Sequence, residues 1–306
     1  MSTTTLIASA TSAMKKRRIA ASADLPPRSI APGPVARTFG IIALVVAMLY
    51  FLVPVFWVFV ASTKSNADLT NTFGFWFAEW NLPANYDSLM NWTQGNFWRW
   101  VGNSVLYSTA AGVIGTLFAV MAGYAIAKFA FPGKKIAVAV IMAGLLLPVA
   151  LLTVPLYMEF HALGLTNTMW AIIIPSAVSP FGVFLGMVYA ESSVPTELLE
   201  AARIDGASEP RIFFTIALRL LSPAMVTIFL FVFVATWNNF LLPLMMISSA
   251  ELKPVTLGLY GMMSYFAPEK GAVMLGALLG VVPLIILFFT LQRYWRSGLA
   301  AGAVKG

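Results

Sequence analysis

Six long apolar stretches without Asp, Glu, Lys or Arg alternate with polar segments along the 306 residues. Each reaches the roughly 20 residues that a helix needs to cross about 30 Å of hydrocarbon. Helices are expected because lipid offers backbone amides and carbonyls no hydrogen-bond partners. The predicted spans are Phe39–Ala61, Ser104–Ala127, Ile136–Met158, Met169–Ala190, Leu220–Ile247 and Ala272–Leu291.

Two residue types inside these stretches bear on packing. Prolines interrupt several spans, which transmembrane helices tolerate where neighbouring groups satisfy the freed backbone atoms. Small residues at spacings of three and four predict a close helix–helix contact along the second span. These small residues are Gly112, Gly115, Ala119 and Gly123.

Composition agrees with a membrane protein. Hydrophobic residues make up 59% of the chain and charged residues only 10%, whereas soluble domains carry about 25% charged residues. The net charge of +7 does not indicate nucleic-acid binding, because the basic residues lie at the edges of apolar runs and form no stripe. The absence of cysteine excludes a thiolate metal site.

Residues 1–37 are rich in Ser, Thr, Ala and Pro and carry the basic cluster Lys15–Arg18. They predict a disordered cytoplasmic tail, because they hold too little apolar surface to fold alone. A cleaved secretory signal is the alternative. The first apolar stretch is longer than a signal core of roughly 7–15 residues and lacks a small-residue cleavage pattern.

The distribution of Lys and Arg predicts the orientation of the chain. If the N-terminus is cytoplasmic, 15 of the 19 basic residues lie in inner segments and 4 in outer loops. Because cytoplasmic loops carry the excess of Lys and Arg, both termini are expected in the cytoplasm.

Elements that would supply energy for transport are missing from the sequence. No predicted span contains an ionisable carboxylate or amine, which proton-coupled carriers place near the membrane midplane. The fragment Gly133–Lys135 has neither the first glycine nor the Ser/Thr of a phosphate-binding P-loop. Sodium sites built from backbone carbonyls stay open as an alternative. If the chain takes part in active transport, we expect energy to enter through a partner.

The polar segment between the fourth and fifth spans, Glu191–Arg219, holds eight charged residues and cannot cross a bilayer. Pro195 suits a helix start and Gly206 a left-handed helix end. Ser208 suits the N-cap of a second helix, with Pro210 in its first turn. The pattern predicts two short helices with a corner at Asp205–Gly206.

One face of the first short helix could meet a partner. Leu198, Ala201, Ala202 and Asp205 follow helical spacing, and the two alanines would allow close approach. Glu197, Glu200 and Arg203 could pair with charges at the rim of a contact. An amphipathic helix lying on the membrane surface is the other interpretation, although its apolar face should carry bulkier residues.

The spacing of this segment resembles a known motif. Glu200-Ala201-Ala202, then Gly206 and Ile216, is similar to the EAA loop of importing ABC-transporter permeases, whose pattern is E-A-A-x3-G-x9-I-x-L-P. The final Leu-Pro is replaced by Leu218-Arg219, with a proline only at Pro223. This departure bears on the bend that leads into the fifth span.

The resemblance extends from about Phe39 to the end of the chain. It is strongest to the second permease subunit of carbohydrate importers of the maltose, trehalose and glycerol-phosphate type. Further matching pieces are Phe131–Lys134, Leu163–Thr168 and Trp237–Phe240. The resemblance implies an all-α integral membrane protein with six transmembrane helices, the type I ABC importer permease fold and cytoplasmic termini. It implies a permease domain over 38–306, with the EAA loop at about 191–219 and a C-terminal tail at 292–306.

The resemblance also implies partners and a subcellular localisation. These are a second permease subunit, a dimer of ATPase subunits, an extracytoplasmic solute-binding protein, a carbohydrate substrate and the lipid of a prokaryotic cytoplasmic membrane. ATP and Mg would be bound by the ATPase subunits, so no cofactor, metal or catalytic residue is expected in this chain. The residues implied in ATPase docking are Glu200, Ala201, Ala202, Asp205, Gly206 and Ala207; those implied in a tail contact with the ATPases are Gly302, Val304, Lys305 and Gly306.

The substrate path is less defined. Asn238 and Asn239 could bind hydroxyl groups of a neutral solute, or could join helices, which is the more common use of polar residues in membranes. Five tryptophans of the first outer loop could stack on sugars, although interfacial anchoring is more common. His161 is the only histidine, and a single histidine makes no metal site.

Other classes are compatible with a polytopic membrane protein. A non-sugar solute such as glycerol phosphate is the nearest rival substrate. A passive channel would work without ATPases. A membrane enzyme could use the outer acids Asp68, Glu79 and Asp87, but no nucleophile–base pair or metal cluster accompanies them. Neither of these two classes accounts for the Glu200–Ala207 segment.

Overall fold

The computed structural model describes residues 33–263 and 269–302, and these residues form helices joined by turns and loops, without a strand. The chain divides into two compact units between Phe56 and Trp57. The described part of the first unit is most of helix α2 (Pro34–Ser62), in which none of the residues before Trp57 is buried. Helix α2 begins inside the segment predicted as a tail, and residues 1–32 of that segment lie outside the described residues.

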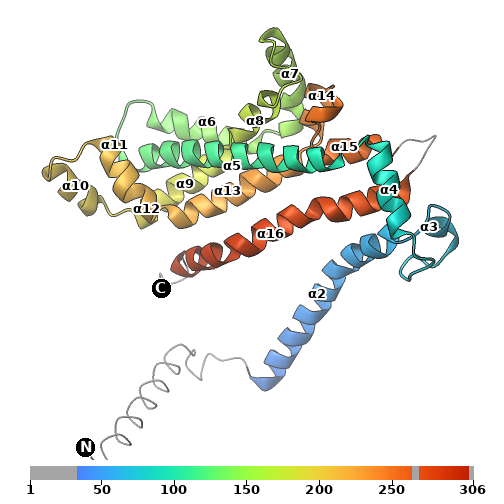
Figure 1. Ribbon diagram of the computed structural model, residues 1–306. Helices are drawn as coiled ribbons and strands as arrows, with labels where there is room; N and C mark the ends of the chain where they lie inside the picture. Colours follow the sequence, from blue (N-terminus) through green and yellow to red (C-terminus); the bar gives the residue numbers. More distant parts are fainter. Residues whose placement is uncertain (1–32, 264–268, 303–306) are drawn as a thin grey trace, which may run out of the picture. The chain divides into compact units, whose positions relative to one another are not determined.

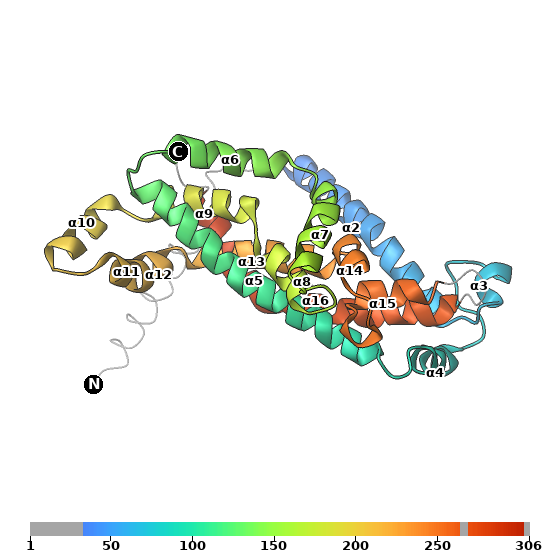
Figure 2. The ribbon, with the colours of Figure 1, turned by 90° about the horizontal axis from the view of Figure 1, so that it is seen from above.

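The second unit is built around α5 (Phe97–Lys128), which packs against three other helical elements (Figures 1 and 2). These are α8 (Trp170–Ala177), α9 (Pro180–Ser193) and α13 (Ser222–Trp237). The last long helix, α16 (Lys270–Gly302), packs against α13 and against α4 (Leu82–Trp92). A short helix, α3 (Asp68–Asn71), precedes α4.

Close contact between α5 and its neighbours depends on glycine, as the small-residue spacing predicted. A Cβ at Gly115 would lie 2.7 Å from the carbonyl oxygen of Ala177, and a Cβ at Gly123 would overlap the backbone nitrogen of Met187. A Cβ at Gly112 would lie 2.8 Å from the ring of Phe229. Larger residues at these positions would push the helices apart, so the predicted close packing is confirmed.

Four helical segments are long and apolar enough to cross a membrane, and the number rises to six if each of two bent pairs is one span. The four are α2, α5, α8 with α9, and α16 as far as Gln292. In the fourth predicted span the chain is extended at Val178 and Ser179, and the Ser179 hydroxyl caps α9 by accepting from the Gly182 amide at 3.0 Å. Pro180 occupies the first turn of α9, where no amide hydrogen is needed.

The predicted span Ile136–Met158 is not one straight helix. It consists of α6 (Lys134–Leu146), the 3-10 turn η1 (Val149–Leu152) and α7 (Thr153–Ala162), with a bend of 100°. Leu147 and Pro148 are extended at the bend. Proline disfavours helical backbone in the residue before it and has no amide hydrogen, so the helix ends there.

The predicted span Leu220–Ile247 is also interrupted. Helix α13 ends at Trp237, and α14 (Leu241–Met246) begins after a short break. The ring of Pro243 would clash with the carbonyl of residue 239 in a continuous helix. The side-chain oxygen of Asn239 accepts from the Leu242 amide at 3.3 Å, so it satisfies a donor at the start of α14.

At the end of α5 opposite to the Glu191–Arg219 segment, side chains hold the loop between α14 and α15 (Val255–Gly261). The Trp100 indole donates to the Ala250 carbonyl at 2.7 Å, and the Asn103 amide donates to two further carbonyls. The Tyr107 hydroxyl donates to the Leu252 carbonyl at 3.0 Å. The backbone of this loop is therefore held by side chains of α5.

We expect Gly123→Ala to destabilise the second unit. The added methyl would meet the backbone of α9, and overpacking of this kind costs about 1–3 kcal/mol. The measurement is the thermal unfolding midpoint of the full chain in lipid nanodiscs. Gly102→Ala is the matched control, because Gly102 lies in the same helix and a Cβ there has nothing within 4 Å. Equal midpoints for the two variants would contradict the close-contact interpretation.

Candidate coupling site

The Glu191–Arg219 segment folds into a helical corner at one end of α5 (Figure 1). Its first helix, α10, spans Thr196–Ile204, and its second, α11, spans Glu209–Ile212. Pro195 is extended and precedes the first helical residue, one position earlier than the first-turn position that the sequence predicted. The two-helix prediction is confirmed.

Gly206 forms the corner. Its φ of +78° is in the left-handed region, which glycine adopts without the penalty that a Cβ brings. The Gly206 amide donates to the Arg203 carbonyl and the Ala207 amide to the Ala202 carbonyl, each at 3.0 Å. These bonds close the carbonyl end of α10, and the extended Ser208 then starts α11. The predicted left-handed helix end is confirmed.

An ion pair joins the two helices across the corner. Arg203 Nε donates to Glu209 Oε1 at 2.6 Å, and the second guanidinium contact, to Oε2, is 3.4 Å. The hydrogen bond to Glu209 raises the pKa of Arg203 above its ordinary value, so the side chain stays charged. Its guanidinium carbon also lies 6.0 Å from the ring centre of Phe129, in the loop after α5. Arg203 thus pairs inside the chain, whereas the sequence suggested a pairing with charges of a partner.

Helix α10 has an inner and an outer face. Leu199, only 1% exposed, and the buried Ala202 belong to the hydrophobic core. Leu198, Ala201 and Ile204 are exposed, and Ile204 reaches 86%. The four residues predicted to share one face therefore do not: Ala202 faces inward, while Leu198, Ala201 and Asp205 face outward.

Ile204 is absent from the set of residues predicted to dock. It lies three positions after Ala201 and six after Leu198, on the outer face. The helical spacing of these apolar positions was the signal that could have identified it. Glu200, Asp205 and Gly206 are also exposed, and Ala207 is partly buried against the core.

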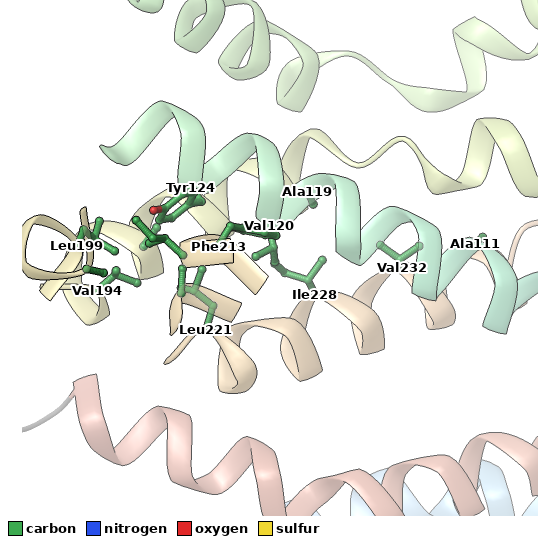
Figure 3. Packing of buried hydrophobic residues seen from close by; sticks show 14 residues of the cluster. Ala111, Ala119, Val120, Tyr124, Val194, Leu199, Phe213, Leu221, Ile228 and Val232 are labelled. Carbon is green, nitrogen blue, oxygen red and sulfur yellow. The ribbon is translucent and has the colours of Figure 1, made fainter. Parts of the chain in front are cut away.

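The inner face connects the corner to the membrane helices (Figure 3). Leu199 belongs to one continuous cluster with Tyr124 of α5 and Phe213, whose rings are 5.2 Å apart. The cluster continues along α13 through Ile228 and Val232. Close-packed side chains transmit displacement because they leave little space to absorb it. A force on α10 would therefore act on α5 and α13.

The bend after the corner is present although Arg219 replaces the proline of the motif. A π-helical segment, η2 (Phe213–Ala217), leads into α12 (Leu218–Leu220), and α13 starts at a bend of 79°. Pro223 lies in the first turn of α13, and the Ser222 hydroxyl donates to the Arg219 carbonyl at 2.9 Å. Pro223 supplies the restriction on the backbone that the motif's proline would supply at position 219.

Asn238 and Asn239, the predicted path residues, lie at the break after α13. The Asn238 amide donates to the Val234 carbonyl of its own helix at 3.0 Å, and its side chain is exposed. The Asn239 carbonyl accepts from the Thr256 hydroxyl of α15 at 3.3 Å. In these contacts Asn238 bonds to the backbone of its own helix, and Asn239 joins the break to α14 and α15.

The remaining predictions concern the C-terminal tail and metal binding. Gly302 is the last residue of α16, so the helix continues into the segment predicted as a tail. Val304, Lys305 and Gly306 lie outside the described residues. Among residues 33–263 and 269–302, no three His, Cys, Asp or Glu side chains gather as metal ligands. His161 stacks on Tyr157 with ring centres 5.7 Å apart.

Comparison with known proteins identifies the family. Residues 115–300 match the family described as "Binding-protein-dependent transport system inner membrane component". The arabinooligosaccharides transport system permease protein AraQ of Halalkalibacterium halodurans is 37% identical over 212 residues, which cover 69% of this chain and 76% of AraQ. The lactose transport system permease protein LacG of Rhizobium radiobacter is 35% identical over 209 residues, covering 68% of this chain and 74% of LacG.

A solved structure shares the fold. It belongs to a bacterial ABC transporter involved in the import of the acidic polysaccharide alginate, and superposes with a TM-score of 0.72 at 22% identity. The match covers 87% of this chain and 99% of that chain. With the family match and the two permeases, it confirms the resemblance found in the sequence. The chain belongs to the inner membrane components of binding-protein-dependent transport systems, and it is a multi-pass membrane subunit of a transporter, not an enzyme.

Proposed function

We propose that this chain is the permease subunit of an ATP-driven, binding-protein-dependent carbohydrate importer in a prokaryotic cytoplasmic membrane. It would form half of the translocation path with a second permease subunit. Two relatives of at least 35% identity are permeases for arabinooligosaccharides and lactose, which supports a saccharide as the substrate class. ATP and Mg would be bound by separate ATPase subunits, and an extracytoplasmic binding protein would deliver the substrate.

Six spans with cytoplasmic termini fit the loop contacts. Arg203 of the corner lies near Phe129, so the loop after α5 and the α10–α11 corner share one end of the helices. That loop continues into Lys134 and Lys135, and the positive-inside rule assigns this end to the cytoplasm. At the other end, the Asn167 side chain accepts from the amides of Ser248 and Ser249, joining two loops on the outer side.

The outer face of α10 is the observation that carries the coupling role. Leu198, Ala201 and Ile204 expose apolar surface on a helix whose inner face is anchored in the core. An exposed apolar helix face on a corner anchored in the core suits insertion into a groove of another protein. We infer that an ATPase subunit contacts this face, and that its motion rocks the permease helices around a midplane path.

The principal experiment is uptake by the assembled transporter in proteoliposomes. We expect saccharide uptake that requires the ATPase subunits, ATP and the binding protein. Competition with glycerol phosphate distinguishes the two substrate classes. Uptake without any nucleotide-hydrolysing subunit would contradict the proposal and favour a passive channel.

Substitutions at two neighbouring alanines, one exposed and one buried, distinguish an effect on docking from an effect on folding. We expect Ala201→Leu to lower substrate-stimulated ATP hydrolysis roughly tenfold or more, the effect of losing about 1.4 kcal/mol of docking affinity when docking limits hydrolysis. Its unfolding midpoint should stay unchanged, because Ala201 is exposed. Ala202→Leu should instead lower the midpoint, because Ala202 is buried.

The control for both variants is Ala67→Leu, an exposed position in the first outer loop. It should change neither hydrolysis nor the midpoint. Full coupling in the Ala201→Leu complex would refute docking through this face.

We expect Glu209→Gln to reduce substrate-stimulated hydrolysis, because it weakens the pair that holds α10 against α11. The pair is solvent-exposed, so salt screens it and the ratio of wild-type to variant hydrolysis should approach unity as ionic strength rises. Assays from low salt to about 0.5 M, a range over which the screening length falls several-fold, test this. A ratio independent of salt would show that Glu209 acts by another route.

A further inference from the structure

Five exposed aromatic side chains gather in the loop that follows α2. They are called the aromatic foot here and comprise Phe73, Phe75, Trp76, Phe77 and Trp80. Phe73 is 73% exposed and Trp76 is 67% exposed. Exposed apolar patches of this kind mark a contact with another protein or with a membrane.

The loop is held in place by a buried lysine. Lys64 is 1% exposed, and its amine donates to the Thr72 hydroxyl at 2.8 Å and to the Phe73 carbonyl at 2.7 Å. At the other end, the Asn81 amide donates to the Thr63 carbonyl at 2.8 Å. Both ends of the loop are therefore tied to the residues directly after α2. The backbone orientation that exposes the rings is fixed by these bonds.

The loop folds back along the last turns of α2. The rings of Phe77 and Phe59 meet edge to face, with centres 6.0 Å apart. A Cβ at Gly74 would lie 3.5 Å from the indole nitrogen of Trp57. Phe59 and Trp57 lie three and five residues before Ser62, which is about 5–8 Å along a helix axis. The foot is thus level with the outer end of an apolar span.

The chemistry of the foot suits the boundary between water and hydrocarbon. Tryptophan collects there because an indole has a large apolar body and one hydrogen-bond donor. In the described residues, neither the Trp76 nor the Trp80 indole donates to a protein acceptor, so both are free to donate to lipid carbonyl or phosphate oxygens. Glu79 is the one charged residue between Phe73 and Trp80.

We propose that the aromatic foot inserts into the headgroup region of the outer leaflet and anchors the first outer loop to the lipid surface. Trp57 and Phe59 near the end of α2 are exposed, and the lipid boundary that meets them continues onto these rings. Lys64 positions the foot through the two bonds at residues 72 and 73. The contact fixes the depth of α2 in the bilayer and does not depend on the nature of the transported solute.

A nitroxide spin label tests the proposal, because the chain contains no cysteine and single-cysteine variants are labelled at one position. The labelled positions are Trp76→Cys in the foot and, as the matched control, Thr70→Cys at an exposed position in the preceding helix α3. The full transporter is reconstituted in phosphatidylethanolamine–phosphatidylglycerol vesicles. We expect oxygen collisions to exceed collisions with a water-soluble nickel complex at position 76, and the reverse at position 70.

Two results would overturn the proposal. One is a label at position 76 that collides with nickel as often as the label at position 70. The other is a label at position 76 that is shielded from nickel only after the solute-binding protein is added, which would make the foot a protein contact.

A second measurement uses variants that keep an aromatic residue at each position of the foot. We expect the double variant Trp76→Phe, Trp80→Phe to lose part of the tryptophan fluorescence that brominated lipids quench. The control is Trp237→Phe, because Trp237 is buried and stacks on Phe233. Unchanged lipid quenching in the double variant would place the foot outside the membrane.

Discussion

The direct contact between the backbones of α5 and α9 is the constraint on which the rest of the second unit depends. Gly123 and Gly186 bring the two helices together without side chains between them. Because α10 follows α9 closely in the chain, this contact also sets where the corner formed by α10 and α11 lies relative to the membrane helices. Dispersion contacts and small residues drive such packing in membranes, where the lipid is as apolar as the helix surface.

The corner combines a fixed inner face with an exposed outer face. Leu199 and Ala202 anchor α10 in the core that includes Tyr124 and Phe213, while Gly206 turns the chain without strain. Arg203 forms an ion pair within the chain, with Glu209. The outer face is therefore mainly apolar at its centre and acidic at its edges, where Glu197, Glu200 and Asp205 are exposed.

Side chains satisfy backbone groups at two of the breaks in the membrane helices: Ser179 caps the start of α9, and Asn239 and Thr256 bond to the backbone at the break after α13. Pro148 and Pro243 remove backbone donors or exclude helical carbonyl positions, and the chain leaves the helix near each of them. Outside the broken helices, α5 supplies Trp100, Asn103 and Tyr107 to the carbonyls of the loop after α14. The long straight helix thus serves as the support on which the irregular segments are arranged.

The sequence by itself determined the features that depend on local chemistry. Apolar length predicted the segments that can cross a membrane, the small-residue spacing predicted the contact of α5, and Pro195, Gly206 and Ser208 predicted the corner. The motif spacing predicted the family. Each of these follows from residues close together in the chain, where propensity, capping and backbone sterics act without distant partners.

Tertiary structure alone decided which groups meet. It bent the predicted span at Leu147–Pro148, because a proline in a membrane helix is compatible with either a mild kink or a full break. It turned Ala202 inward and Ile204 outward, since the core beneath α10 comes from α5 and α13. It also placed the Arg203 side chain against Glu209, with which it forms an ion pair, and near the ring of Phe129. Glu209 is only six residues from Arg203, but the positions of Phe129 and of the core beneath α10 depend on how distant helices pack, which no local pattern encodes.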